Sequence, residues 1–190
     1  MKLLVLDNYD SFTYNLVHMF RSMNIDHEVY RNDKISPEEA LSFDLIILSP
    51  GPGIPSEAGN MGKIIAACAG KKPILGICLG HQAIAEYLGA KLNNMSSVYH
   101  GVKNKINILS NEEIFEGIPE EIEVGRYHSW QVVREGLPEN ISVTAEDENG
   151  TIMALSDASQ KLYGIQFHPE SVMTEYGEEM IQNFLKIAQS

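Results

Sequence analysis

The sequence predicts an α/β fold whose core is a doubly wound, mostly parallel open sheet with a small antiparallel extension. Through residue 88, short apolar runs alternate with segments of helical periodicity, a pattern typical of parallel strands between two helical layers. After residue 88 the apolar runs are separated by turn residues, as in antiparallel strands. No linker or change in composition divides the 190 residues, so we expect a single domain, residues 1–190.

The first half of the chain contains four expected strands and the helices between them. Ser36 and Glu39 match a capping box, with Pro37 at the first position of a helix. Asp10 or Ser11 is expected to cap the first long helix. The expected strands are 2–6, 27–31, 45–48 and 73–75, and the other expected helices are 11–23, 60–69 and 82–88.

The second half contains shorter strand-like segments and a final amphipathic helix at 177–188. These strands are expected to extend the sheet and to add an antiparallel flap. They are 105–109, 131–134, 141–145, 151–155 and 162–167.

The segment Gly76-Ile77-Cys78-Leu79-Gly80 joins an expected strand to a helix and matches a nucleophile elbow with a thiol in place of the hydroxyl. Side chains at positions 76 or 80 would collide with neighbouring backbone in so tight a turn. Cys78 would lie exposed at its tip, where the amides of the first helical turn favour a thiolate. A cysteine taken alone is more often an inert core residue, as we interpret Cys68, but the flanking glycines favour a nucleophile at position 78.

His168 is the best candidate for the proton donor that a thiol nucleophile requires. Glu170 lies two residues further on, so in extended backbone the two side chains point to one side. Glu170 could then orient one imidazole nitrogen while the other faces Cys78. On spacing alone, a solvated loop histidine beside an unrelated glutamate is an equally good interpretation. His81 is closer to Cys78 in sequence, but one helical turn along it is expected to pack or to cap.

Polar or glycine-rich segments follow three of the expected strands at their carboxyl ends, where ligands bind in such sheets. They are residues 7–11, the loop Ser49-Pro50-Gly51-Pro52-Gly53, and the elbow itself. The proline–glycine loop is compatible with a fixed ring of backbone amides for an oxyanion, but taken alone it is better interpreted as a plain turn. Gln82 could bind a ligand through its amide or bond to local backbone at the helix start.

Composition argues against several classes of function. The formal net charge of −12 disfavours nucleic acid and anionic membrane surfaces as partners. No apolar run approaches the length of a membrane span, and the N-terminus lacks the pattern of a signal peptide. The two cysteines do not form a disulfide framework, and the six histidines lack paired metal-ligand spacing. We therefore expect a cytoplasmic protein without a metal site.

Two long motifs resemble those of the class I (triad) glutamine amidotransferases: Gly76-Ile77-Cys78-Leu79-Gly80-His81-Gln82 and Gln166-Phe167-His168-Pro169-Glu170-Ser171. Residues 7–16, residues 49–53 and the segment Arg126-Tyr127-His128-Ser129 are similar to the small subunit of anthranilate synthase and to the amidotransferase subunit of aminodeoxychorismate synthase. The resemblance covers essentially the whole chain and implies the flavodoxin-like fold of that family.

The resemblance also implies a chemistry. Cys78 would attack the side-chain amide of glutamine, His168 would protonate the departing ammonia, and Glu170 would orient His168. No cofactor is implied in this chain. The ammonia would be used by a larger chorismate-binding synthase subunit, since 190 residues are too few to hold that domain as well.

Binding roles follow from the same resemblance. The implied oxyanion donors are the backbone amides of Gly53 and Leu79. The implied glutamine-binding groups are Gln82, the backbone of Ser129 and Trp130, and the loop Gly51-Pro52-Gly53. Two positions depart from the family pattern, with consequences for the pocket wall and for partner contacts: Trp130 replaces the usual leucine, and Val102 stands where lysine is common, with Lys103 one residue later.

Four alternatives stay open. The first is an aminodeoxychorismate synthase subunit, or one shared by the folate and tryptophan pathways. The second is the amidotransferase subunit of a GMP synthase, which residues 8–13 disfavour. The third is an independent cysteine hydrolase. The fourth is a non-catalytic regulatory module, against which the presence of Cys78, His168 and Glu170 argues.

Overall fold

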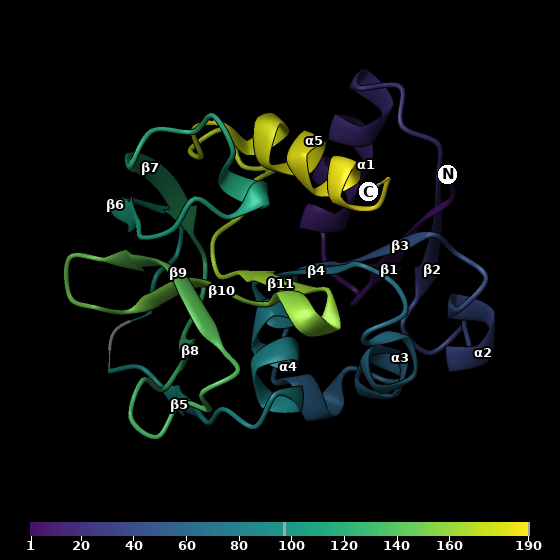
Figure 1. The fold of residues 1–190 in the computed structure, drawn as a ribbon, viewed down its shortest axis with the longest axis horizontal. Coiled ribbons are helices and arrows are strands. Elements are labelled where there is room, and N and C mark those ends of the chain that lie inside the picture. The colour runs from purple at the N-terminus through teal and green to yellow at the C-terminus, as the bar shows by residue number, and fades with distance from the viewer. Residues whose placement is uncertain (97, 190) are drawn as a thin grey trace.

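A nine-stranded mixed sheet crosses the described residues, 1–96 and 98–189, of this computed structural model (Figure 1). Its strand order is β2-β1-β3-β4-β11-β10-β9-β6-β7. The parallel half consists of β2 (His27–Arg31), β1 (Leu3–Asp7), β3 (Leu45–Leu48), β4 (Ile74–Ile77) and β11 (Leu162–Ile165). The antiparallel half consists of β10 (Ile152–Asp157), β9 (Ser142–Asp147), β6 (Val102–Ile108) and β7 (Glu121–Arg126). A separate antiparallel pair joins β5 (Leu92–Asn94) to β8 (Trp130–Val132).

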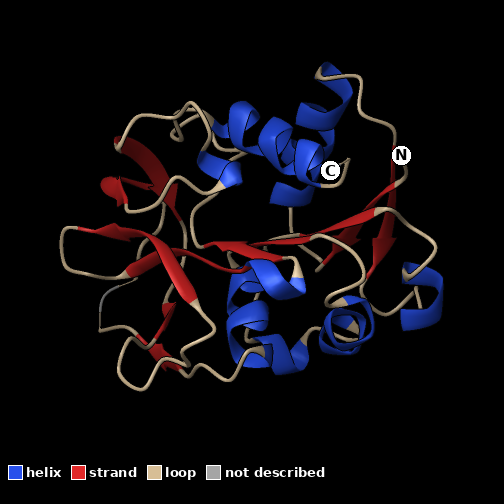
Figure 2. Cartoon of the chain, viewed as in Figure 1, coloured by secondary structure: helices blue, strands red, loops and turns tan. Residues whose placement is uncertain are grey.

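Helices cover both faces of the parallel half (Figures 1 and 2). One face carries α1 (Phe12–Ser22) and α5 (Gly177–Ile187), and the other carries α3 (Met61–Cys68) and α4 (Leu79–Tyr87). The short α2 (Pro37–Ala40) contacts α3. Three 3-10 turns complete the elements of the described chain: η1 (Pro55–Glu57), η2 (Glu113–Phe115) and η3 (Ala158–Gln160). This is the doubly wound α/β class that the sequence predicts.

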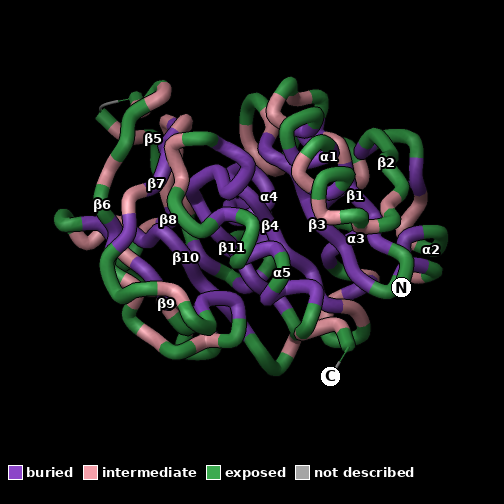
Figure 3. Tube along the Cα trace, turned by 90° about the horizontal axis from the view of Figure 1, so that it is seen from above, coloured by how far each residue is buried: buried purple, intermediate pink, exposed green. Residues whose placement is uncertain are grey.

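Alternate residues of the parallel strands enter two separate hydrophobic cores. Leu3 and Val5 of β1 lie in the core under α1 and α5, whereas Leu4 and Leu6 lie in the core over α3 and α4. All four side chains are fully buried, because β1 lies between two helical layers. Figure 3 shows the same burial along β3, β4 and β11, while the edge strand β2 is largely exposed.

Several elements differ from the sequence prediction. Two strands, β5 and β7, lie where no strand is predicted, since amide and charged side chains interrupt their apolar residues. The segment expected at 131–134 is β8, which pairs with β5 instead of extending the main sheet. The helix expected from residue 82 begins three residues earlier, because Cys78 is its N-cap. The antiparallel part of the main sheet also has four strands and is nearly as wide as the parallel part.

Both predicted helix caps are observed, in α2 as a capping box and in α1 through the Asp10 side chain. Ser36 Oγ accepts a hydrogen bond from the Glu39 amide at 3.2 Å, and Glu39 Oε2 accepts one from the Ser36 amide at 2.8 Å, which completes the capping box. Ser11 is the N-cap of α1 but makes no side-chain capping bond. Asp10 Oδ1 accepts from the Phe12 amide at 2.7 Å instead.

The loops after β1, β3 and β4 meet at the carboxyl-terminal edge of the parallel half, as predicted, and the end of β11 joins them. The Asn8 amide donates to Ser49 Oγ at 2.9 Å, which ties the loop after β1 to the loop after β3. The Cys78 amide donates to the carbonyl of Ile165 at 2.9 Å, which ties the elbow to the end of β11. Cys78, His168 and the loop 49–53 therefore follow buried strands at one edge of the sheet.

Two findings concern the described part of the chain only. None of its helices combines the length and the apolar character needed to cross a membrane. Nor does it contain a group of three or more histidine, cysteine, aspartate or glutamate side chains arranged to hold a metal ion.

Candidate active site

Cys78 lies on a strained turn between β4 and α4. Its backbone has φ 51° and ψ −98°, a conformation that a residue with a side chain rarely adopts. A Cβ at position 76 would collide with the backbone of Gly80, and a Cβ at position 80 would lie 2.6 Å from Leu48 Cβ. The sequence prediction that both glycines are needed for a tight strand–helix turn is thus confirmed. The thiol, only 6% exposed, is less open to solvent than the sequence suggests.

His168 and Glu170 form a buried pair beside Cys78. Nδ1 of His168 lies 2.7 Å from Oε1 of Glu170, and both side chains are almost completely inaccessible. Burial alone would lower the pKa of His168, but the interactions with Cys78 and Glu170 outweigh it and raise the pKa well above its usual value. The raised pKa favours the protonated imidazolium, which can donate a proton from Nε2.

The geometry leaves Nε2 of His168 as the nitrogen that can exchange a proton with a ligand. In the described part of the chain Nε2 is buried and has no hydrogen-bond partner of normal geometry. Phe12 and Tyr127 pack their rings against the imidazole, with centroids 4.8 and 4.9 Å away. These contacts, together with the Nδ1–carboxylate bond, fix the plane of the ring.

A small pocket of about 190 Å³ opens in front of Cys78. Six of the seven residues that the resemblance implies for substrate binding line it: Gly51, Pro52, Gly53, Gln82, Ser129 and Trp130. The seventh, Leu79, directly follows Cys78 in the chain, and its buried side chain packs against Gly51. His168 and Glu170 are not among the residues that line the pocket.

The amide of Gln82 has a defined orientation in this pocket. Its Nε2 donates to the carbonyl oxygen of Trp130 at 3.1 Å and to Oε1 of Gln166 at 3.2 Å. Gln166 is fully buried just before the His168 loop. The amide nitrogen of Gln82 therefore does not bond to backbone at the helix start, which is the local alternative that the sequence leaves open.

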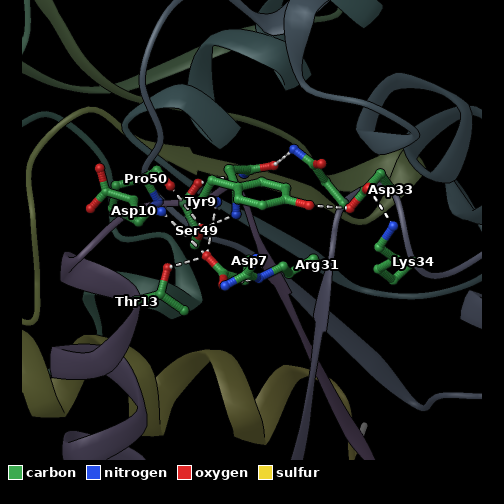
Figure 4. Close-up of polar contacts among 11 residues, drawn as sticks. Asp7, Tyr9, Asp10, Thr13, Arg31, Asp33, Lys34, Ser49 and Pro50 are labelled. Carbon is green, nitrogen blue, oxygen red and sulfur yellow. Dashed lines mark hydrogen bonds and ion pairs between the residues drawn. The ribbon is translucent and has the colours of Figure 1, made fainter.

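Hydrogen bonds from Asn8 hold the proline–glycine loop, residues 49–53, in place. Its Nδ2 donates to the carbonyl of Ser49 at 2.8 Å, and its Oδ1 accepts from Asn32 at 3.0 Å. Ser49 Oγ accepts from the Asn8 amide and donates to the carbonyl of Pro50 at 2.8 Å. This buried network, part of which is shown in Figure 4, holds the loop beside Cys78.

The same close-up shows further polar contacts of Asp7 and Tyr9, next to this network (Figure 4). Asp7 Oδ1 accepts from the Tyr9 amide at 2.9 Å and from Thr13 Oγ1 at 3.0 Å. The Tyr9 hydroxyl donates to Asp33 at 2.6 Å, and the Arg31 guanidinium lies over its ring at 4.5 Å. The loop after β1 is thus fixed on both sides.

A second network contains His128, which lines the pocket with Ser129 and Trp130, and continues to the buried Arg126 and Asp147. Arg126 is fully buried, and its Nη1 donates to Asp147 Oδ2 at 2.6 Å. Its Nε donates to His128 Nε2 at 3.1 Å. Nδ1 of His128 lies 2.8 Å from the carbonyl oxygen of Trp130.

His81 is a core residue, as its position on the helix suggests. It is completely buried, it packs against Gly164 of β11, and it does not line the pocket. Burial lowers its pKa to about 3, so it stays neutral at physiological pH. His168, by contrast, is the histidine whose interaction with Cys78 raises its pKa.

Several residues of the site have no role predicted from the sequence. Asn8, Phe12 and Tyr127 fall within the motifs of the resemblance, but their contacts depend on chain segments far apart in sequence. Arg126 and His128 carry a weak local signal, since residues two apart at a strand end point to one side. Their partner Asp147 lies 21 residues from Arg126 and has no signal of its own.

Comparisons with known proteins agree with this geometry. Residues 4–188 match the family model described as Glutamine amidotransferase class-I. Anthranilate synthase component 2 of Pseudomonas aeruginosa is 44% identical, over 97% of this chain and 94% of that protein. Aminodeoxychorismate/anthranilate synthase component 2 of Bacillus subtilis is 43% identical, over 97% of this chain and 95% of that protein.

A solved structure extends the likeness to three dimensions. A protein of Thermoplasma acidophilum, provisionally named as a subunit of GMP synthase, superimposes with a TM-score of 0.89 and is 30% identical, over 100% of this chain and 94% of that one. The identity to the two component 2 proteins is higher than to this structure. With an elbow cysteine, a buried histidine–glutamate pair and a family match over nearly all its residues, this chain belongs to the class I glutamine amidotransferase family.

Proposed function

We propose that this chain is the glutamine-hydrolysing subunit of an anthranilate synthase and that it delivers ammonia to a larger, chorismate-using subunit in tryptophan biosynthesis. One observation carries the chemistry: Cys78 stands on a strained elbow at a small pocket, beside the buried His168–Glu170 pair. The names of the relatives at 43 and 44% identity support the assignment to the synthase.

The first half-reaction forms a thioester. The Cys78 thiolate attacks the side-chain amide carbon of glutamine, and the carbonyl electrons move onto oxygen. The backbone amides of Gly53 and Leu79 stabilise this oxyanion. When the carbonyl reforms, the carbon–nitrogen bond breaks, and the leaving nitrogen takes the proton from Nε2 of His168 and departs as ammonia. A glutamyl thioester and a neutral His168 remain.

The second half-reaction restores the enzyme. Nε2 of His168 accepts a proton from water as the water oxygen attacks the thioester carbon. Collapse of this intermediate breaks the carbon–sulfur bond and releases glutamic acid, which ionises in solution, together with the Cys78 thiolate. Glu170 holds Nδ1 throughout and stabilises the imidazolium in the resting state. No cofactor in this chain is needed.

Glutamine binding uses the pocket lining. Gln82 and the backbone of Ser129 and Trp130 hold the amino-acid part of glutamine, and the loop Gly51-Pro52-Gly53 closes the side near the reacting amide. The mechanism requires Cys78 as a free thiol, and neither cysteine forms a disulfide among the described residues. A reducing compartment such as the cytoplasm fits this requirement.

A second candidate is the amidotransferase subunit of aminodeoxychorismate synthase, or one subunit serving both enzymes. It is favoured by the Bacillus subtilis relative, whose name joins the two activities. Purifying the chain with its natural partner and identifying the product from chorismate distinguishes the candidates, since one partner yields anthranilate and the other aminodeoxychorismate. An independent hydrolase would instead turn over glutamine at full rate without any partner.

The catalytic assignment is tested by Cys78→Ser in the complex. We expect glutamine-dependent synthesis to be abolished, because a serine hydroxyl is not ionised here, and synthesis driven by ammonium salt to be retained. Loss of both activities would contradict the role assigned to Cys78. Covalent labelling by a glutamine-like electrophile should occur at Cys78 and be blocked by glutamine, whereas labelling at Cys68 would argue against the elbow.

A further inference from the structure

The two hydrogen bonds of His128, which itself lines the pocket, fix its tautomer. A guanidinium can only donate, so Nε2 of His128, 3.1 Å from Arg126 Nε, must accept and carries no proton. Burial and the nearby Arg126 charge lower the pKa of His128 to about 4, so the ring is neutral and its single proton is on Nδ1. Nδ1 therefore donates to the Trp130 carbonyl at 2.8 Å.

Arg126 is held rigidly at the start of this chain of bonds. Asp147 accepts from its Nη1 through Oδ2, and the Tyr99 ring covers the guanidinium with its centroid 3.6 Å from Cζ. Asp147 is fixed in turn, because its Oδ1 accepts from the amides of Asn149 and Thr151, each at 2.9 Å. Arg126 does not line the pocket, whereas His128 and Trp130 do, so the hydrogen-bonded path from Arg126 to a ligand runs through His128.

The chain of bonds ends at the group that orients Gln82. The Trp130 carbonyl accepts from His128 Nδ1 and from Gln82 Nε2, and the second hydrogen of Gln82 Nε2 goes to Gln166 Oε1. With both hydrogens used, the amide oxygen is the group of Gln82 left to face a ligand. A rotated Trp130 carbonyl would release this amide and shift the backbone of the pocket wall.

We propose that Arg126 and His128 are positioning residues that set the Trp130 carbonyl and, through it, the orientation of Gln82 in the glutamine pocket. The inference rests on the proposed function for the identity of the ligand. Besides any contribution to stability, the buried Arg126–Asp147 pair then determines which nitrogen of His128 carries the proton, because Arg126 Nε lies 3.1 Å from His128 Nε2. The reacting groups Cys78 and His168 lie outside this chain of bonds.

Replacing His128 separates positioning from packing. His128→Ala removes the donor to Trp130, whereas His128→Asn keeps an N–H donor at the place of Nδ1, because the asparagine amide follows the same Cβ–Cγ geometry. Arg126→Met removes the group that dictates the tautomer. Arg134→Gln is the matched control, since Arg134 forms an exposed ion pair with Glu146 and does not line the pocket.

The experiment measures two alkylation rates of Cys78 in the full-length chain, with and without glutamine. The reagent is iodoacetamide, which needs only a reactive thiol, and the readout of binding is the glutamine concentration that half-protects Cys78 from it. For His128→Ala we expect this concentration to rise about tenfold, the value of one well-placed hydrogen bond, while the unprotected rate stays within about twofold. His128→Asn should recover most of the loss, and Arg134→Gln should match the wild type.

Each contrary outcome has a distinct meaning. Unchanged half-protection in His128→Ala, or no recovery in His128→Asn, would overturn the positioning role. A fall of the unprotected alkylation rate together with protection would also overturn it, because the effect would then reach the reacting thiol. A wild-type chain that glutamine does not protect would overturn the proposed function, and this inference with it. Arg126→Met is interpreted only alongside its thermal unfolding curve, and the His128 pair decides the matter if that variant does not fold.

Discussion

The two halves of the sheet contribute to the site by different physical means. In the parallel half, β1, β3, β4 and β11 are buried and end in loops that present Cys78, the proline–glycine loop and His168. Close backbone packing defines these loops, as at Gly76 and Gly80. In the antiparallel half, β7 and β9 carry the buried pair Arg126–Asp147, and polar bonds position the wall opposite.

This difference indicates what each half can tolerate. Shape at the elbow depends on the absence of a side chain, and no polar partner can compensate for a collision with backbone. The wall depends on matched donors and acceptors, so it should tolerate changes of shape better than the loss of one partner of a pair. The two halves should therefore fail differently when single residues are replaced.

The largest effect is expected in the parallel half. In Gly76→Ala the new Cβ would meet the backbone of Gly80, which cannot move without displacing α4, so we expect the chain not to reach its native fold. Gly62→Ala in α3 is the matched control, because Gly62 is exposed and, apart from its chain neighbours and the backbone of its own helix, nothing lies within 4 Å of the new methyl carbon. That change should stabilise by up to about 1 kcal/mol, since alanine favours helix. Denaturant unfolding of both variants tests this, and a native-like Gly76→Ala would contradict it.

The next effect tests the antiparallel half. Arg126→Met leaves Asp147 buried without its cation, and we expect the free energy of unfolding to fall by about 3 to 5 kcal/mol. Arg134→Gln breaks the exposed pair with Glu146 and should cost less than about 1 kcal/mol. Adding Asp147→Asn to Arg126→Met should recover part of the loss, because the remaining amide is neutral. Equal losses in the two single variants would show that burial does not distinguish these pairs.

The two halves also differ in how far the sequence predicts them. The parallel strands are continuous apolar runs because both faces are buried, and the elbow shows itself by glycine spacing around Cys78. The strand β7 and the pair Arg126–Asp147 have no such signal, because a polar residue inside a sheet is interpretable only once its partner on another strand is known. The family motif identifies Ser129 and Trp130 as candidates but not what holds them.

Each half of the sheet packs beside a buried neutral histidine, His81 or His128, and both should make the protein less stable in acid. Burial lowers the pKa of His81 to about 3 and, with the Arg126 charge, that of His128 to about 4, against 6.5 in the unfolded chain. Below pH 6.5 the unfolded state therefore binds more protons, so stability is lost as the pH falls. Each histidine contributes a slope of up to about 1.4 kcal/mol per pH unit.

His168 does not disturb this window, because its pKa is raised. Its contribution is fully present below pH 6.5 and is lost only as the pH rises through the raised value. The free energy of unfolding, measured between pH 4.5 and 6.5, should therefore depend less steeply on pH for His128→Asn than for the wild type. The difference in slope should correspond to one proton, about 1.4 kcal/mol per pH unit. An unchanged slope would mean that His128 is protonated in the folded protein.

The smallest effect is expected at Trp130, and it shows whether the wall acts through backbone or side chain. His128 Nδ1 and Gln82 Nε2 both bond to the Trp130 carbonyl, which any residue at this position provides. Trp130→Leu, which restores the residue usual in the family, should therefore change the KM for glutamine by less than about twofold, since no hydrogen bond in the wall is lost. A tenfold rise in KM would mean that the indole contacts glutamine. The wall would then recognise glutamine by its shape, as the loops of the parallel half do, and not only through its hydrogen bonds.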